Sequence, residues 1–411
     1  MDSMLSAANG TRKPVVIIGS GCTGLAIANG LKKAGVPVVV CEKSPALHVK
    51  GERDWNMGVH WGFPILKSLM PESSAALLQT VHVDPNTPVN AVDKLSFLNG
   101  STGDLMTAVE IPYFYRLRRS KLRALLAHDL DIRWNKTLKD IVYADDEGGG
   151  ATAIFEDGEH IEGCLIIGAD GARSQVRRLL VGPEKSINTR IPYVSIFIQA
   201  KYTREQALFL RSFHPLYLSA PHPEGLVTFF GLQDAPELDK PEDWTFFFTI
   251  SWQSSLATQD EEMKTLGVRD RLQQARERGV RFCEPFKSAY AWLPEDQLAW
   301  YIKLAVWDPS NPDHQWDNRG GRVTLAGDAA HPMTFQRGQG LNHAIADCGE
   351  LVKNFTMLGA SQEQAIGTYE DSMKERAGEE VRSSVLNTTM LHDWQQVLNS
   401  PLMKHGLQAK S

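Results

Sequence analysis

The sequence of 411 residues predicts an α/β fold: a Rossmann-like parallel sheet, an inserted mixed or antiparallel sheet, and C-terminal helices. Three observations predict this fold. A strand, glycine loop, helix and second strand are expected over residues 14–42, β-rich runs follow over residues 188–305, and the first pattern returns over residues 322–351. Apolar strands that alternate with helices are typical of parallel sheets, whereas consecutive β-rich runs indicate a separate sheet.

The opening unit has the pattern of a nucleotide-binding βαβ unit. Val15–Ile18 is an apolar run, expected as a buried strand, and glycines in G-x-G-x-x-G spacing follow it. Gly19 permits a tight turn, Gly21 lets the backbone approach a pyrophosphate, and Gly24 lets helix and strand pack closely. Glu42 ends the second strand and can accept hydrogen bonds from a ribose hydroxyl, which favours an adenosine without a 2′-phosphate. The unit predicts a bound dinucleotide; the alternative is a glycine-rich turn that only packs a helix on a sheet.

Composition and charge narrow the possible classes of protein. With 42% hydrophobic and 22% charged residues, the chain is typical of soluble globular proteins. A formal net charge of −6 provides no electrostatic surface for nucleic acid or anionic membranes. The five cysteines are scattered and never in C-x-x-C, which indicates a reducing compartment and no zinc site. No stretch reaches the roughly 18 apolar residues of a membrane span, so a cytoplasmic protein is expected.

Residues 43–64 form a long, aromatic and irregular stretch. Loops of this length in compact domains are usually functional or mobile. Arg53, Trp55, His60 and Trp61 could line a pocket here. Packing of the two tryptophans in the core is an equally good explanation.

Three arginines crowd the entrance of a helix that is expected to begin near Ser120. Arg116, Arg118 and Arg119 place positive charge where the helix dipole is already positive, which is unfavourable unless an anion lies nearby. A pyrophosphate would be such an anion, and Arg119 is the best placed to reach it. The alternative is a solvated basic edge.

Three consecutive strands are expected next: Leu138–Ala144, Ala151–Phe155 and His160–Ile167. The last one leads into GADGARSQVRR, so Asp170 and Gly171 lie at the carboxyl end of a strand. In open α/β sheets, ligands bind at this edge.

Residues 188–305 are expected to form a separate antiparallel sheet with one helical span, Val268–Arg278. Alternate residues of its strands would face a common pocket. Each candidate for the pocket lining is individually more typical of core packing. These candidates are Tyr193, His214, Tyr217, Phe230 and Trp252.

The first pattern returns at Arg322–Ala326, an expected buried strand that ends in Gly327 and Asp328. A loop leads from there to the G-Q-G segment, and a helix is expected to begin near Gly338. A last helical region is expected over Gln362–Leu398.

Three stretches now stand in order: the glycine unit with Glu42, GADGARS-x-V-R, and AGDAAHP followed by R-G-Q-G-L-N. Together they resemble the group A flavoprotein monooxygenases, single-component FAD-dependent aromatic hydroxylases with the para-hydroxybenzoate hydroxylase fold. The segment RDWNMGVHWG is similar to fungal members that act in secondary metabolism. The resemblance covers residues 14 to about 355. It agrees with a discontinuous FAD-binding domain at 14–187 and 306–358 and a β-sheet substrate domain at 188–305. Outside it, the residues themselves predict a flexible tail at 1–13 and a C-terminal helical region at 359–411.

The resemblance implies a role for each matching motif. The glycines and Glu42 would hold the ADP half of FAD, with Arg119 beside the pyrophosphate. Asp170 and Gly171 match the family's DG motif, which serves FAD and is linked to transient binding of the pyridine nucleotide. Asp328 matches the acid that binds the ribityl chain.

The later motif would lie at the ring end of the flavin. Pro332 would lie near the isoalloxazine and Gly338–Asn342 near its pyrimidine edge, where the positive end of a helix stabilises the reduced ring. Many relatives carry proline where this chain has Phe335. His331 is expected to serve the structure of the loop by local hydrogen bonds. The predicted FAD-binding residues are Gly19, Gly21, Gly24, Glu42, Arg119, Asp170, Asp328, Pro332, Gly338, Gly340, Leu341 and Asn342.

The implied reaction is a monooxygenation. NADPH or NADH would reduce FAD, O₂ would form a flavin C4a-hydroperoxide, and one oxygen would pass to an electron-rich small molecule, aromatic or similar to a polyketide or alkaloid. The loop Arg53–Gly58 would be the gate, and Arg53, Tyr193 and Tyr217 are the candidate catalytic residues. Alternatives are epoxidation, Baeyer–Villiger oxidation, a flavin dehydrogenase or oxidase, and a non-catalytic protein with an FAD-binding fold. The oligomeric state stays open.

Overall fold

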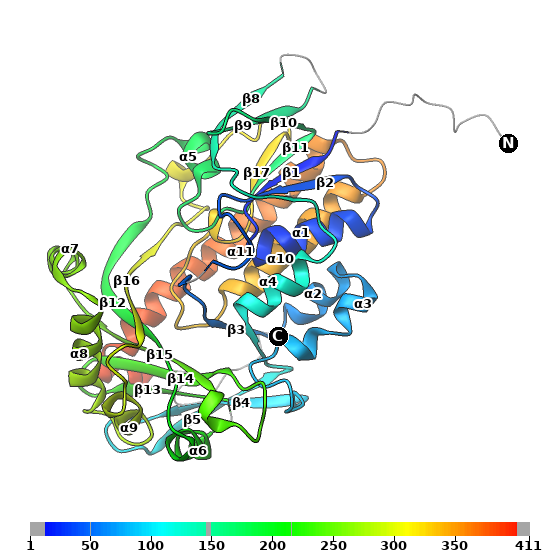
Figure 1. Cartoon of the computed structure of the whole chain (residues 1–411). Coiled ribbons are helices and arrows are strands. Elements are labelled where there is room, and N and C mark those ends of the chain that lie inside the picture. The colour runs from blue at the N-terminus through cyan, green and yellow to red at the C-terminus, as the bar shows by residue number, and fades with distance from the viewer. Residues whose placement is uncertain (1–12, 50, 145–148, 215, 401–411) are drawn as a thin grey trace.

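Two sheets form the centre of the molecule. The structure, a computed structural model, describes residues 13–49, 51–144, 149–214 and 216–400. Figure 1 shows a parallel sheet with its helices at one end and a larger mixed sheet at the other. The predicted α/β class, with an additional mixed sheet and C-terminal helices, is confirmed.

The parallel sheet is built around its central strand, β1. Val15 lies opposite Val38 in one neighbouring strand and Leu165 in the other, and every residue of β1 is buried. A strand buried on both faces requires an unbroken apolar run, which explains the composition of this segment. In spatial order the strands are β17 (Val323–Leu325), β11 (Leu165–Gly168), β1 (Val15–Ile18), β2 (Val38–Cys41) and β7 (Ile132–Arg133).

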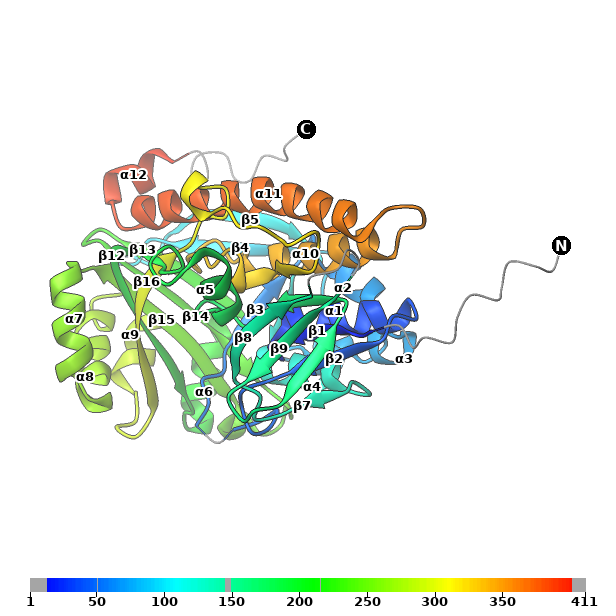
Figure 2. The same cartoon turned by 90° about the horizontal axis from the view of Figure 1, so that it is seen from above.

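Helices α1, α2 and α10 pack together beside this sheet. Gly30 of α1 permits the close approach, because a Cβ there would lie 2.9 Å from a methyl group of Val352 on α10. Figure 2 shows α11 along one side of the molecule, from α10 to the far end of the mixed sheet, where α12 follows. The helices in this half and at the C-terminus are α1 (Cys22–Lys33), α2 (Phe63–Leu69), α3 (Glu72–Ala75), α4 (Arg119–Ala127), α5 (Gln175–Val181), α10 (Gly340–Thr356), α11 (Gln362–Leu391) and α12 (Trp394–Asn399).

A small antiparallel sheet lies against the parallel one. It contains β8 (Leu138–Tyr143), β9 (Ala151–Phe155) and β10 (His160–Gly163). The prediction of one continuous strand over residues 160–167 was wrong, because the chain passes from one sheet to the other at Gly163. A Cβ at Gly163 would lie 2.8 Å from the Pro14 carbonyl oxygen, so only glycine fits this crossing.

The mixed sheet takes strands from two separate parts of the sequence. In spatial order they are β16 (Leu298–Val306), β12 (Thr189–Ala200), β15 (Thr245–Gln253), β14 (Leu226–Asp234), β13 (Tyr217–His222), β4 (Val92–Leu98) and β5 (Leu105–Pro112). All pairs are antiparallel except β13 with β4. The sheet therefore extends beyond residues 188–305 and includes a hairpin from the range expected to bind FAD.

Among the described residues, four α-helices rather than the one predicted accompany this sheet. They are α6 (Arg204–Phe213), α7 (Leu256–Thr265), α8 (Val268–Gly279) and α9 (Phe286–Ala291). Polar residues dominate the sequences of α7 and α8, so an apolar period is hard to detect in them, whereas side-chain caps mark the starts of α6 and α7. Thr203 accepts from the Gln206 amide and Ser255 from the Thr258 amide.

A two-stranded ribbon joins the two halves. Strand β3 (Asn56–Val59) pairs with β6 (Tyr115–Arg118), and Asn56 Nδ2 donates to the Leu232 carbonyl in the mixed sheet at 2.9 Å. Much of the loop predicted to be the gate, Arg53–Gly58, is therefore a paired strand. Across the described residues, no helix has the length and apolar character needed to cross a membrane.

Candidate active site

The glycine loop after β1 is tightly packed on one side and open on the other. A Cβ at Gly19, where φ is +108°, would lie 2.5 Å from the Ala169 carbonyl oxygen. One at Gly24 would lie 2.1 Å from the Gly19 carbonyl oxygen. At Gly21 the nearest atom, the Ala169 oxygen, is 3.9 Å away. The backbone at Gly21 thus stays accessible to a ligand, as expected where a pyrophosphate approaches a helix start.

The later glycine–aspartate motif packs directly on this loop. Gly327 has φ of +60°, and a Cβ there would lie 2.5 Å from Thr23 Oγ1, in the first turn of α1. Its amide donates to the buried Asp347 Oδ2 at 2.7 Å. Two motifs about 300 residues apart in the sequence therefore share one edge of the parallel sheet.

Asp328 lies in a recess at this junction. Its side chain is exposed, although Gly327 and Ala329 on either side are buried. Desolvation by the surrounding protein raises the pKa of Asp328, while nearby cations, including Arg119 and Arg177, oppose that rise. An accessible carboxylate surrounded by protein suits a hydroxylated ligand that brings its own hydrogen-bond donors.

The DG motif is connected to the same junction by Arg177. Asp170 accepts from Ser174 Oγ at 2.5 Å and from the Gln175 amide at 2.6 Å, and so caps α5. The following Gly171 has φ of +80° with no atom near its missing Cβ. Arg177, only 1% exposed, donates to the Ala329 carbonyl at 2.8 Å. Sequence reasoning assigned Arg177 no role, although the arginine of the V-R segment was visible in the motif.

Glu42 is already engaged by the protein. Its carboxylate accepts from the Ser20 amide at 2.8 Å and the Ser20 hydroxyl at 2.9 Å, and from the Ser44 amide at 2.9 Å. Burial raises the pKa of Glu42, but these hydrogen bonds outweigh it and leave the pKa below its ordinary value. Arg123, 4% exposed, donates to the Ser20 carbonyl at 3.0 Å. Sequence reasoning missed Arg123, because its apolar neighbours in α4 predict only a packing face. The ribose contact of Glu42 stays a prediction.

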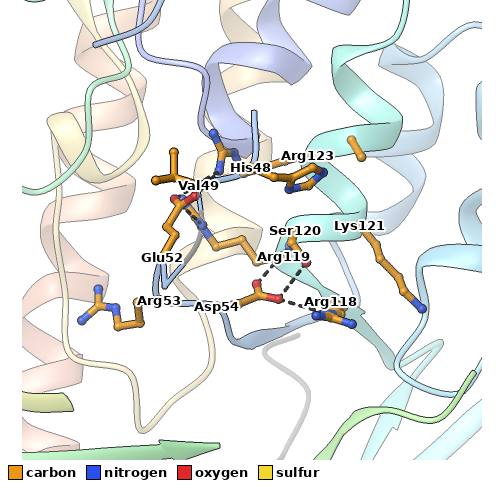
Figure 3. A pocket seen from close by; sticks show the side chains of 11 residues that line it. His48, Val49, Glu52, Arg53, Asp54, Arg118, Arg119, Ser120, Lys121 and Arg123 are labelled. Atoms are coloured by element: carbon orange, nitrogen blue, oxygen red, sulfur yellow. Dashed lines mark hydrogen bonds and ion pairs between the residues drawn. The ribbon is translucent and has the colours of Figure 1, made fainter. Parts of the chain in front are cut away.

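A pocket of about 380 Å³ opens beside this loop (Figure 3). The guanidinium groups of Arg53 and Arg119 lie over the Trp55 ring, at 4.8 and 4.5 Å from its centroid. Trp55 therefore lies beside two residues of the pocket lining, and the pyrophosphate contact of Arg119 stays a prediction. The lining residues are His48, Val49, Glu52, Arg53, Asp54, Arg118, Arg119, Ser120, Lys121, Arg123 and Ala124.

The charges of this pocket are only partly balanced. Asp54 accepts from the Ser120 amide at the start of α4 and from Arg118 Nε at 2.9 Å. Glu52 meets Arg119 and Arg123 at 3.4 and 3.2 Å. Cationic side chains still outnumber the two carboxylates of the lining, so the pocket favours an anionic ligand.

The start of α10 closes the other end of the site. The helix begins at Gly340, two residues after the predicted position, with no side-chain cap and no acid in its first turn. Gly338 has φ of +64° and open space at its missing Cβ. Asn342 is buried and accepts from the His60 amide at 3.0 Å, and Leu341 is half-buried. The helix start therefore offers unpaired amides and a partial positive charge to a ligand.

The loop before α10 is held by contacts with α10, Trp307 and the mixed sheet. His331 is fully buried, and its Nε2 lies 2.6 Å from Asp347 Oδ2. His331 thus serves the structure of the loop, but its side-chain partner is in α10, 16 residues later, rather than in the loop as predicted. Pro332 is also buried and accepts from the Trp307 amide at 3.0 Å, and Phe335 meets Phe197 of the mixed sheet edge to face at 4.9 Å.

The candidate lining residues of the mixed sheet separate onto its two faces. Phe230 and Trp252 belong to the core on the helix-covered face, so the pocket interpretation was wrong for them. Tyr193 lies on the other face, 7% exposed, and clusters with Phe335. Tyr217, on that same face, donates to Asp93 Oδ2 at 3.0 Å. Burial and the Asp93 carboxylate raise the pKa of Tyr217, so its hydroxyl stays protonated at neutral pH.

These features fit a nucleotide-cofactor enzyme whose phosphate end is predicted at Gly21 and whose ring end is predicted at α10. The open glycines, the recess at Asp328 and the uncapped helix fit FAD. The comparisons identify the family. An FAD binding domain family matches residues 309–384. The FAD-dependent monooxygenase cctM of Talaromyces islandicus is 34% identical over 97% of each chain. Another, dbaB of Emericella nidulans, is 37% identical over 83% of this chain and 86% of its own.

Solved structures show the same fold. Klebsiella pneumoniae HpxO in complex with FAD and uric acid has a TM-score of 0.71 at 19% identity, over 95% of this chain and 92% of its own. The 2,6-dihydroxypyridine-3-hydroxylase of Arthrobacter nicotinovorans has a TM-score of 0.70 at 17% identity, over 93% and 94%. The chain belongs to the FAD-dependent monooxygenase family, and FAD is its cofactor.

Proposed function

We propose that this monooxygenase uses NADPH or NADH and O₂ to hydroxylate an aromatic or similarly electron-rich small molecule in fungal secondary metabolism. One observation carries the proposal: an aromatic face of the mixed sheet lies against the loop at the ring end. Phe335 of that loop meets Phe197, which in turn meets Phe247 at 5.5 Å. Such a surface suits a flat, apolar substrate. Relatives named as fungal FAD-dependent monooxygenases support the setting.

FAD supplies the redox and oxygen chemistry when it is bound. The chain's own residues bind, orient and exclude water. In this proposal the pocket arginines hold the phosphates, Asp328 receives the polyol chain, and the start of α10 stabilises negative charge at the ring. Arg53, Tyr193 and Tyr217 remain the candidates for substrate contact. Because Tyr217 is protonated, its role would be to donate or orient rather than to act as a base.

Oxygen uptake by the purified holoenzyme tests this function. NADPH or NADH should drive O₂ consumption, a substrate should accelerate flavin reduction under anaerobic conditions, and labelled dioxygen should place one labelled atom in the product. Product analysis separates hydroxylation from epoxidation and Baeyer–Villiger oxidation. Flavin reduction by neither nucleotide, across a panel of phenols and naphthols, would contradict the proposal.

A further inference from the structure

A buried arginine in strand β6 has no anionic partner. Arg116 is 8% exposed, and among the described residues no hydrogen-bond acceptor or carboxylate contacts its guanidinium group. Three aromatic rings surround the group instead. Its central carbon lies 5.0 Å from the ring centre of Phe229, 5.6 Å from that of Phe114 and 5.9 Å from that of Tyr217. Nearby Arg118 and Arg123, by contrast, both pair with carboxylates.

A buried guanidinium group without an anionic partner favours the binding of an anion. A guanidinium carries five N–H donors, and cation–π contacts leave those donors unfilled. Burial lowers the pKa of Arg116 to about 10, and the only opposing influence is Tyr217, which is itself held in its neutral form. The group therefore remains a cation at neutral pH, and a carboxylate would satisfy both its charge and its paired donors.

The position of Arg116 links the aromatic sheet face to the ring end of the cofactor site. A Cβ on Gly58, the cross-strand partner, would lie 2.6 Å from the Phe114 ring and 3.2 Å from Arg116 Nη1, so the glycine leaves room for both side chains. The Gly58 carbonyl accepts from Asn342 Nδ2 at 3.3 Å, in the first turn of α10. On the opposite side, Tyr217 and Phe229 come from adjacent strands of the mixed sheet.

We propose that Arg116 binds an anionic oxygen of the substrate, a carboxylate or an ionised phenol or enol, while Phe114, Tyr217 and Phe229 contact its flat ring. The site would select acidic aromatic substrates over neutral ones and fix which edge of the substrate lies away from the flavin. This proposal deepens the proposed function by naming a substrate class. It rests on that function in one respect, namely that the bound anion is the substrate.

The test compares matched charged and neutral probes. Salicylate and salicylamide, and the corresponding hydroxynaphthoate and hydroxynaphthamide, differ in charge but hardly in shape. Their dissociation constants are measured from flavin difference spectra of the holoenzyme, without pyridine nucleotide. We expect at least one acid to bind on the order of tenfold to a hundredfold more tightly than its amide, as charge-assisted hydrogen bonds imply.

Three variants locate the preference. Arg116→Met keeps the apolar stem and should bring the acid-to-amide ratio close to one, and Arg116→Lys should retain part of it. The control is Arg278→Met, which removes a guanidinium 4.0 Å from the Trp252 ring on the other face of the sheet and should leave the ratio unchanged. FAD content and thermal unfolding confirm that each variant is folded.

Several outcomes would overturn the proposal of an anion site at Arg116. They are equal binding of acids and amides to the wild type, no measurable binding of any acid, or a ratio that persists in Arg116→Met. If Arg116→Met does not fold, an undiminished ratio in Arg116→Lys has the same meaning. Failure of NADPH and NADH to reduce the flavin, with the acid preference intact, would instead refute the proposed function and leave the anion site standing.

Discussion

The contact between Gly327 and Thr23 leads to a sharp stability prediction. Gly327→Ala introduces two costs: a left-handed residue, about 1–2 kcal/mol, and a Cβ 2.5 Å from Thr23 Oγ1, about 1–3 kcal/mol by the usual range for overpacking. Thr23→Ala removes the Oγ1 and Cγ2 atoms at 2.5 and 2.9 Å and leaves the Cβ at 3.2 Å. We therefore expect Gly327→Ala to cost about 2–5 kcal/mol in the wild type, and about 1–2 kcal/mol less in the Thr23→Ala background.

Urea unfolding of the wild type, the two single variants and the double variant measures this coupling. All four are compared as FAD-free apoprotein, so cofactor binding makes no contribution. Gly320→Ala is the matched control, since Gly320 has φ of +65° and no atom within 4 Å of its missing Cβ. It should show the conformational cost alone. If the effects at Gly327 and Thr23 add to within about 0.5 kcal/mol, the two motifs do not touch, and the convergence on which the site depends is refuted.

Three further predictions concern buried polar groups. Glu42→Gln should weaken FAD binding and reduce stability above pH 5. The folded-state pKa of Glu42 lies below its unfolded value, so its stabilising contribution is lost only as pH falls through the folded pKa. FAD titration, and urea unfolding at pH 7 and pH 4, check this prediction. Asp347→Asn should cost about 3–5 kcal/mol of unfolding free energy, since it breaks the fully buried pair with His331; urea unfolding beside the wild type measures it. Tyr217→Phe should leave the pH profile of flavin reduction unchanged from pH 6 to 9, because that hydroxyl does not ionise in this range; loss of a titration step would refute the donor role.

Local patterns predicted the cofactor-binding edge closely. β1 coincides with the predicted strand Val15–Ile18, and α1 and β2 follow it within the predicted unit over residues 14–42, because strand, glycine turn and helix are fixed by neighbouring residues. Helix α10 begins two residues after its predicted start, a difference that is common for helix ends. Packing of the motifs on one another also followed from their shared place at the carboxyl ends of parallel strands.

Pairing over long distances could not be predicted from the same patterns. The β4–β5 hairpin joins the mixed sheet through a parallel contact with β13, more than 100 residues later in the chain. Nothing in its alternation of residues specifies that partner. Arg116 shows the same limit. Sequence reasoning grouped it with Arg119 as helix-entrance charge, but strand pairing turns it away from the pocket and into an aromatic cluster.

The ribbon formed by β3 and β6 connects the arginine-lined pocket to the Arg116 cluster, so that one cannot move without the other. Asp54, two residues before β3, accepts from Arg118 Nε, and Arg118 Nη1 also reaches Asp234 of the mixed sheet at 2.5 Å. Gln199 of the same sheet donates to the Asp54 carbonyl at 2.5 Å. A gate at Arg53–Gly58 cannot swing as a free loop, because its opening would break these contacts and shift Gly58 against Arg116. Any opening should therefore move the arginine-lined pocket and the Arg116 cluster together.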